Sequence, residues 1–255
     1  MESTYNLNGA SKGMTVGHNG GSEFRLGGSE DLGNGMKADF NYAFVQDHNK
    51  GTGAPGNYNS YVGLSGDFGS IKVGSTWAPL ALATWGNSAM GGAFIDSNLA
   101  NGGGATPESI TYTSPSIAGI TLAVQGNNKA TSSNGYSLTY AAGAFSASYA
   151  SNTTEGAKAI NGLGANYDFG MVKVFVSSLT QSGQSDASGI GISVPVGAAT
   201  LIASSSSQAK KSAYELVAKY NLSKRTMVYF QNKVTDAGAT AASVSTNAVG
   251  ISHAF

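Results

Sequence analysis

The stretch SEFRLGGSEDLGNGMKADFNYAF, residues 22–44, alternates apolar and polar side chains on both sides of a short turn. Phe24 and Leu26 share one face of its first half, and Phe40 and Tyr42 share one face of its second half. The Asn-Gly pair between the halves supplies the positive φ that a tight hairpin turn needs. A period of two residues is typical of half-buried strands, so this stretch predicts an antiparallel β-hairpin.

The same alternation recurs along the chain and predicts about sixteen short strands. Its clearest repeat is residues 171–178, where three valines alternate with Lys173, Phe175 and Ser177. The other predicted strands span residues 60–65, 70–76, 109–113, 120–126, 135–141, 144–151, 157–168, 189–194, 198–205, 212–220, 226–234 and 242–255. Short turns alternate with longer polar loops, as in outer-membrane barrels. We therefore expect one all-β domain over residues 1–255, an antiparallel transmembrane β-barrel.

The composition agrees with a wall that faces lipid. Charged residues are 11% of the 255, with 14 basic and 14 acidic side chains, so nothing favours a nucleic-acid partner. A soluble chain of this size would carry more charge, whereas a barrel turns half of its side chains toward hydrocarbon. There is no cysteine and no run of 18 apolar residues, so neither a thiolate site nor a transmembrane helix is expected. No signal peptide is visible, and we expect any export signal to have been removed.

Residues 78–107 form the longest stretch without a sustained strand pattern. A structureless segment of this length is usually functional, and we expect it to fold into the mouth of the barrel and narrow the pore. A solvated surface insertion is the alternative, but the stretch is too apolar for a solvated linker. Trp77 and Trp85 are expected to pack the loop against the wall. Asp96, the only charged residue of the loop, is a candidate constriction acid.

The candidate pore-lining side chains lie on the faces opposite the apolar ones. They are Glu23, Arg25, Lys37, Asp39, Tyr61 and Lys72. Thr111 is a further candidate. Glu108 has the parity of Ile110, so we expect it at the rim. Glu30 and Asp31 are expected to organise the nearby turn by hydrogen bonding. Tyr214, Tyr220 and Tyr229 suit the aromatic belt at the membrane interface.

An enzyme is the rival interpretation, and the sequence does not favour it. His18 and His48 lie in Gly- and Asn-rich segments without a clear nucleophile, and His253 lies two residues from the end. The glycine-rich residues 102–104 lack the lysine of a phosphate loop. We expect no catalytic residue, no metal and no cofactor.

Five motifs, in order, resemble the general porin family of Gram-negative bacteria, in particular its β-proteobacterial type. They are SEFRLGGSEDLGNGMKAD (22–39), YVGLS (61–65) with Phe68-Gly69, ITYTSP (110–115), YNLSKRT (220–226) and GISHAF (250–255). The resemblance implies a sixteen-stranded barrel, usually a trimer, whose third outer loop bends into the pore. It also implies wall arginines at positions that here are Gly27, Ser75 and Thr111, which puts the family's anion preference in doubt. Ser75 would face the lumen only if Gly74 marks a bulge.

The function that we expect is passive diffusion of small hydrophilic solutes and ions across the outer membrane, with weak charge selectivity. The alternatives are a structural or adhesive barrel with a closed lumen, and a substrate-specific channel. The expected partners are membrane lipids, lipopolysaccharide and two further copies of the chain. Phe255, on the face of Val249 and Ile251, resembles the terminal signal that is read by the outer-membrane insertion machinery.

Overall fold

The computed structural model describes residues 2–8, 12–16, 23–45, 56–57, 59–89, 104–127, 129, 131–236, 238 and 242–255. They form eighteen strands and one helix. The first strands are β1 (Glu2–Asn6), β2 (Gly13–Val16), β3 (Glu23–Gly33), β4 (Met36–Val45), β5 (Gly56–Asn57), β6 (Ser60–Gly66) and β7 (Gly69–Trp77), followed by helix α1 (Pro79–Gly86). The strands β8 (Ala105–Thr113), β9 (Ile120–Asn127), β10 (Ser133–Ala142), β11 (Phe145–Thr154), β12 (Ile160–Asp168) and β13 (Lys173–Gln181) come next. The chain ends with β14 (Ala187–Val196), β15 (Ala199–Gln208), β16 (Lys211–Asn221), β17 (Thr226–Asp236) and β18 (Val244–His253).

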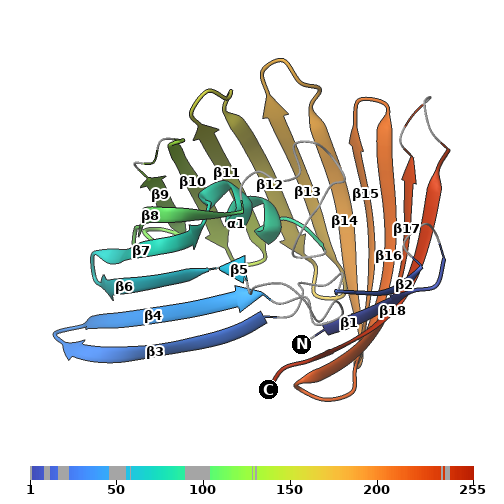
Figure 1. Cartoon of the computed structure of the whole chain (residues 1–255), viewed down its shortest axis with the longest axis horizontal. Coiled ribbons are helices and arrows are strands. Elements are labelled where there is room, and N and C mark those ends of the chain that lie inside the picture. The colour runs from blue at the N-terminus through green and yellow to red at the C-terminus, as the bar shows by residue number, and fades with distance from the viewer. Residues whose placement is uncertain are drawn as a thin grey trace.

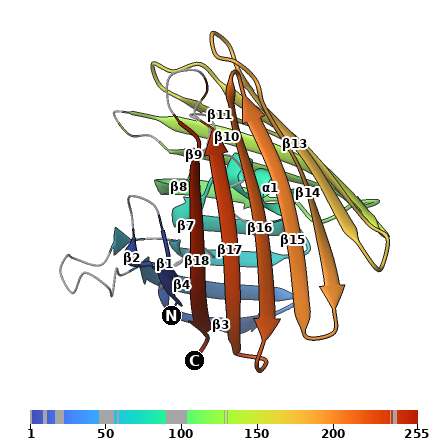
Figure 2. The ribbon, with the colours of Figure 1, turned by 90° about the vertical axis from the view of Figure 1, so that its right-hand side faces the viewer.

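The strands pair antiparallel in chain order and form one strongly curved sheet (Figure 1). The order continues from β10 to β18, where β1 pairs with β18 and β2 with β1. Figure 2 shows the two chain ends close together at the end of β18. Fifteen strands have at least seven residues, and the five-residue β1 is a sixteenth. The prediction of about sixteen antiparallel strands is therefore confirmed.

The hairpin predicted from residues 22–44 is present as β3 and β4. Phe24 lies opposite Phe44 and Leu26 lies opposite Tyr42, so these aromatic and aliphatic side chains share one face. Asn34 and Gly35 turn the chain with φ of 52° and 76°, the two positive values of a type I′ turn. The alternation of Phe24 and Leu26 ends at Gly27, but the ladder of the first strand continues through the glycines to Gly33.

The sheet has an apolar outer face and a polar inner face. Directly paired residues of antiparallel strands have side chains on the same face of the sheet. The register therefore identifies the inner and outer residues of each strand from those of its neighbour. Outer side chains such as Phe24, Val62 and Leu163 are 58%, 65% and 60% exposed. Serine, threonine, asparagine and glutamine side chains such as Gln125 and Asn166 are buried on the inner face. This polarity is the reverse of a soluble barrel and is typical of a membrane barrel.

Helix α1 corrects the expectation that residues 78–107 have no secondary structure. Proline occupies its first turn, where no intrahelical N–H is needed, and the Leu-Ala-Leu-Ala run that follows has high helix propensity. Strand β8 also begins inside this stretch, at Ala105. The described helix is too short to cross a membrane. Asp96 lies outside the described residues.

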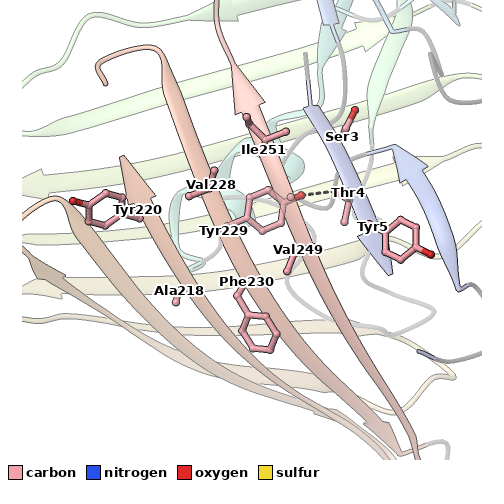
Figure 3. Close-up of a pocket in the computed structure, with 11 residues that line it drawn as sticks. Ser3, Thr4, Tyr5, Ala218, Tyr220, Val228, Tyr229, Phe230, Val249 and Ile251 are labelled. Atoms are coloured by element: carbon pink, nitrogen blue, oxygen red, sulfur yellow. Dashed lines mark hydrogen bonds between the residues drawn. The ribbon is translucent and has the colours of Figure 1, made fainter. Parts of the chain in front are cut away.

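A tyrosine on the inner face joins the two ends of the chain. Tyr229 on β17 is buried, and its hydroxyl makes a hydrogen bond with Oγ1 of Thr4 on β1, across the intervening strand β18 (Figure 3). Gly250 lies opposite Tyr229 in the register, and a methyl group there would overlap the tyrosine ring. Placing Tyr229 in the outer aromatic belt was therefore wrong: its neighbours Val228 and Phe230 face outward. Tyr214 and Tyr220 do lie on the outer face, 55% and 50% exposed.

Candidate pore wall and constriction

Helix α1 lies against the inner face of the sheet, over β10–β12 (Figure 1). Its side chains Leu80 and Ala83 pack with Ala150, Leu179 and Ala187 in one buried cluster. Leu80 is fully buried there. Burial of the apolar side of the helix therefore holds it on the wall, and this accounts for the apolar composition that the sequence showed.

Asn87, directly after the helix, fixes the loop to the wall with hydrogen bonds. Its Nδ2 donates to Oγ of Ser148 at 2.6 Å and to the carbonyl oxygen of Ala83 at 2.8 Å. Its Oδ1 accepts from Nδ2 of Asn166 at 2.9 Å. All of these side chains are buried, so loss of one partner would leave a polar group without a hydrogen bond in the interior.

The point where the chain leaves the wall is held by a second polar cluster. Oγ1 of Thr76 lies 2.8 Å from Oγ of Ser109 and 2.6 Å from Oγ1 of Thr111. Nε2 of Gln125 donates to Oγ1 of Thr76 at 2.8 Å and to the carbonyl oxygen of Trp77 at 3.0 Å. The loop therefore starts from a rigid base on three neighbouring strands.

The two tryptophans join the wall to the loop. Trp77 ends β7 and Trp85 lies in α1, and their ring centroids are 4.5 Å apart in an edge-to-face arrangement. Such aromatic pairs stabilise a contact beyond the area that they bury. The geometry agrees with the interpretation that these rings pack the loop against the wall.

Four of the candidate pore-lining residues lie close together on the inner face. Lys72 is opposite Thr111 in the register, and its Nζ lies 4.2 Å from the centre of the Tyr61 ring. Asp39 is opposite Gly63, and its carboxylate occupies the space that a side chain there would need. A base on β7 and an acid on β4 thus flank Gly63 of the intervening strand β6, and the threonine lies opposite the base on β8.

The remaining described candidates are spread along the wall. Glu23 and Arg25 lie at the start of β3, and Oε1 of the acid is 2.6 Å from Nη2 of the arginine. Lys37 lies at the other end of the hairpin, opposite Asp31 and Ser65. The structure therefore does not bring all the candidates into one cluster. The opposite charges of Glu23 and Arg25 largely cancel each other's electric field at a distance.

The candidates left out inner charges that the same alternation identifies. Glu215, Lys219 and Lys233 occupy inner positions of β16 and β17, with Glu215 opposite Lys233. Nε2 of Gln231 donates to Oε1 of Glu215. Their signal was their parity, which opposes that of Tyr214 and Leu216 in β16 and that of Val228 and Phe230 in β17.

The inner charges gather on one side of the sheet, in β3–β7 and β16–β17. In the described strands β8–β15, the register places only Asp168 and Lys173 as charged inner side chains, beside the short turn of residues 169–172. That neutral side is the one that α1 covers. Helix α1 therefore leaves the charged side uncovered, and the described part of the loop reaches that side only at Ala89, which packs against Ile202, Val217 and Tyr229.

The register also decides the direction of Ser75 and Glu108. The pairing between β7 and β8 shifts after Gly74, where the extra residue belongs to β8, while Ser75 keeps regular pairing with Ser60. Ser75 therefore stays on the outer face, and Thr76 points inward. Glu108 has a φ of 52° at this irregularity and forms an ion pair of 2.8 Å with Lys129.

Asp31 has the turn role that the sequence indicated. Its Oδ1 accepts a hydrogen bond of 2.9 Å from the backbone N–H of Gly33. This is a typical way for an aspartate to hold a turn two residues further on. Asp31 therefore acts on the backbone of the hairpin.

A barrel wall with an apolar outside, a polar inside and a loop helix on its inner face defines a transmembrane β-barrel of the outer-membrane type as the class. The family model for Gram-negative porins matches residues 2–240, and the chain belongs to this family. The family resemblance found in the sequence is thereby confirmed, and the protein belongs to the outer membrane of a Gram-negative bacterium.

The relatives agree with this assignment. The major outer membrane protein P.IB of Neisseria gonorrhoeae is 39% identical over 143 residues, which cover 51% of this chain and 40% of that protein. An anion-selective porin from Comamonas acidovorans has the same fold with a TM-score of 0.77, at 24% identity, over 100% of this chain and 96% of the other. A loop-deletion variant of OmpT from Vibrio cholerae also gives a TM-score of 0.77, at 12% identity, over 99% and 95% of the two chains. The match to the curated relative spans less than half of that relative, and the two structures show the fold alone.

Proposed function

We propose that this protein forms a water-filled channel for passive diffusion of small hydrophilic solutes and ions across the outer membrane. The observation that carries the proposal is the loop helix on the polar inner face of a sheet whose outer face is apolar. Helix α1, held against the neutral side, leaves most of the charged side available to water and solutes. The channel needs no energy source and no cofactor, and we expect no catalysis.

The mechanism is exclusion by width together with a modest electric field. Arg25, Lys37, Lys72, Lys219 and Lys233 supply positive charge, whereas Glu23, Asp39 and Glu215 supply negative charge. The pair of Glu23 and Arg25 is nearly neutral at a distance, and salt screens the other charges within ~8 Å. We therefore propose a permeability ratio of K⁺ to Cl⁻ near one, although one structural relative is called anion-selective.

Conductance of the purified full chain in planar lipid bilayers, bathed in KCl, tests this function. Stable current steps of one size are expected, and steps in groups of three would support a trimer. A structural or adhesive barrel with a closed lumen would insert without steps. Correctly folded protein that inserts but carries no current would reject the channel.

The assembly that we propose follows the family. Residues 1–255 form one barrel domain, three copies associate, and lipid and lipopolysaccharide cover the apolar outer face. Phe255, which is 88% exposed, would present the terminal signal to the insertion machinery. Cross-linking of the protein in native membranes, followed by electrophoresis, tests the number of copies.

A further inference from the structure

Four glycines of the wall lie directly beneath the loop. They come from three strands, β10, β12 and β14, and their inner faces meet residues of the segment 79–89. We call them the glycine cradle: Gly135, Gly162, Gly164 and Gly191.

The loop approaches Gly162, Gly164 and Gly191 too closely for a side chain, whereas at Gly135 the loop atom is 3.3 Å away and the nearer obstacle is Oδ1 of Asn152 on the neighbouring strand, at 2.7 Å. A Cβ at Gly164 would lie 2.6 Å from Cβ of Asn87, and a Cβ at Gly191 would lie 2.8 Å from Cβ of Ala89. Ordinary contacts of a Cβ begin at 3.4 Å. The blocking atoms sit next to the loop backbone, so rotation of a side chain cannot remove the overlap.

The other two glycines of the cradle meet the start of the helix. A Cβ at Gly162 would lie 2.6 Å from Cδ1 of Leu80, which is fully buried, and a Cβ at Gly135 would lie 3.3 Å from Cδ of Pro79. The cradle therefore follows the loop from its first helical turn to Ala89.

Backbone geometry does not require glycine at these positions. None of the four has a φ in the positive range. Glycine inside a strand weakens the strand, and a close approach of another backbone is a common reason for it. Here the loop is that second backbone.

We propose that the glycine cradle sets how deeply the constriction loop lies against the wall, and thereby sets the width of the passage. This inference rests on the proposed channel function. A larger residue in the cradle would lift the loop, and the wall behind it leaves only the interior as a direction. The passage would then narrow without any change of charge.

Gly191 gives the sharpest test, because Cβ of Ala89 is the only loop atom among its nearest neighbours. The variant Gly191→Ala is expected to lower single-channel conductance in KCl and to lower the size limit for neutral sugars in swelling of loaded vesicles. The double variant Gly191→Ala with Ala89→Gly moves the methyl group from loop to wall and should restore both values. The reversal potential should stay the same in all of them.

Gly27→Ala is the matched control. Gly27 is also an inner-face strand glycine, but a Cβ there would meet only Phe40 and Asn41 of the neighbouring strand. It adds a methyl group to the interior without touching the described loop, so conductance should be unchanged. An equal loss in Gly27→Ala and Gly191→Ala would overturn the proposal.

Ala89→Val presses from the loop side on Gly191 and on the adjoining wall cluster of Ile202, Val217 and Tyr229 and leaves every barrel strand unaltered, so it replaces Gly191→Ala if that variant does not fold. It should lower conductance in the same way. Wild-type conductance in Ala89→Val, or no recovery in the double variant, would refute the cradle. A wild type without any current would instead refute the channel itself.

Discussion

Gly250→Ala should destabilise the barrel through one side chain, Tyr229. The added methyl group would overlap the tyrosine ring that crosses β18 to reach Thr4. Overpacking of a filled site costs about 1–3 kcal/mol, and loss of the hydrogen bond adds about 0.5–1.5 kcal/mol. The expected decrease in the free energy of unfolding is therefore about 1.5–4.5 kcal/mol, the sum of these two ranges.

Urea unfolding of the protein refolded in lipid vesicles, followed by the fluorescence of Trp77 and Trp85, measures this cost. The control is the same substitution in a Tyr229→Ala background, where no ring remains to be displaced. There Gly250→Ala should cost less than half as much. Tyr229→Phe, which removes only the hydroxyl, should cost about 1 kcal/mol. An equal cost of Gly250→Ala in both backgrounds would refute the reasoning.

The other predictions concern the outer face, export and selectivity. Val174→Arg places a charge on the outer face opposite Tyr167 and Ile192, and should cost ~2–4 kcal/mol if it lies near the membrane midplane; a vesicle-unfolding loss near zero would contradict this placement. Deletion of Phe255 should lower surface levels in cells more than refolding yield in detergent, and unchanged surface levels would count against a signal role. Asp96→Asn should shift the reversal potential across a KCl gradient toward anions; no shift would place Asp96 outside the constriction.

The alternation of apolar and polar residues along each strand was sufficient to predict which side chains of the wall face outward and which face inward. Side chains in a strand point to opposite faces with a period of two, so Phe24 and Lys72 could be assigned to their faces without knowledge of the fold. The turn at Asn34-Gly35 was equally local, because φ at these residues depends on the residues themselves. The same rule would have placed Tyr229 inward and would have found Lys233, had parity been given more weight than residue type.

The tertiary structure alone decided where the loop lies. Helix α1 has only eight residues, too few for a helical period to stand out. The position of the helix on the wall depends on contacts between residues far apart in the chain, such as Leu80 with Gly162 and Asn87 with Ser148. The strand pairing likewise decided that the extra residue near Gly74 belongs to β8 and not to β7, so that Ser75 keeps the outer face. Such contacts depend on close packing between segments that are far apart in the sequence. No local pattern of side chains encodes that packing.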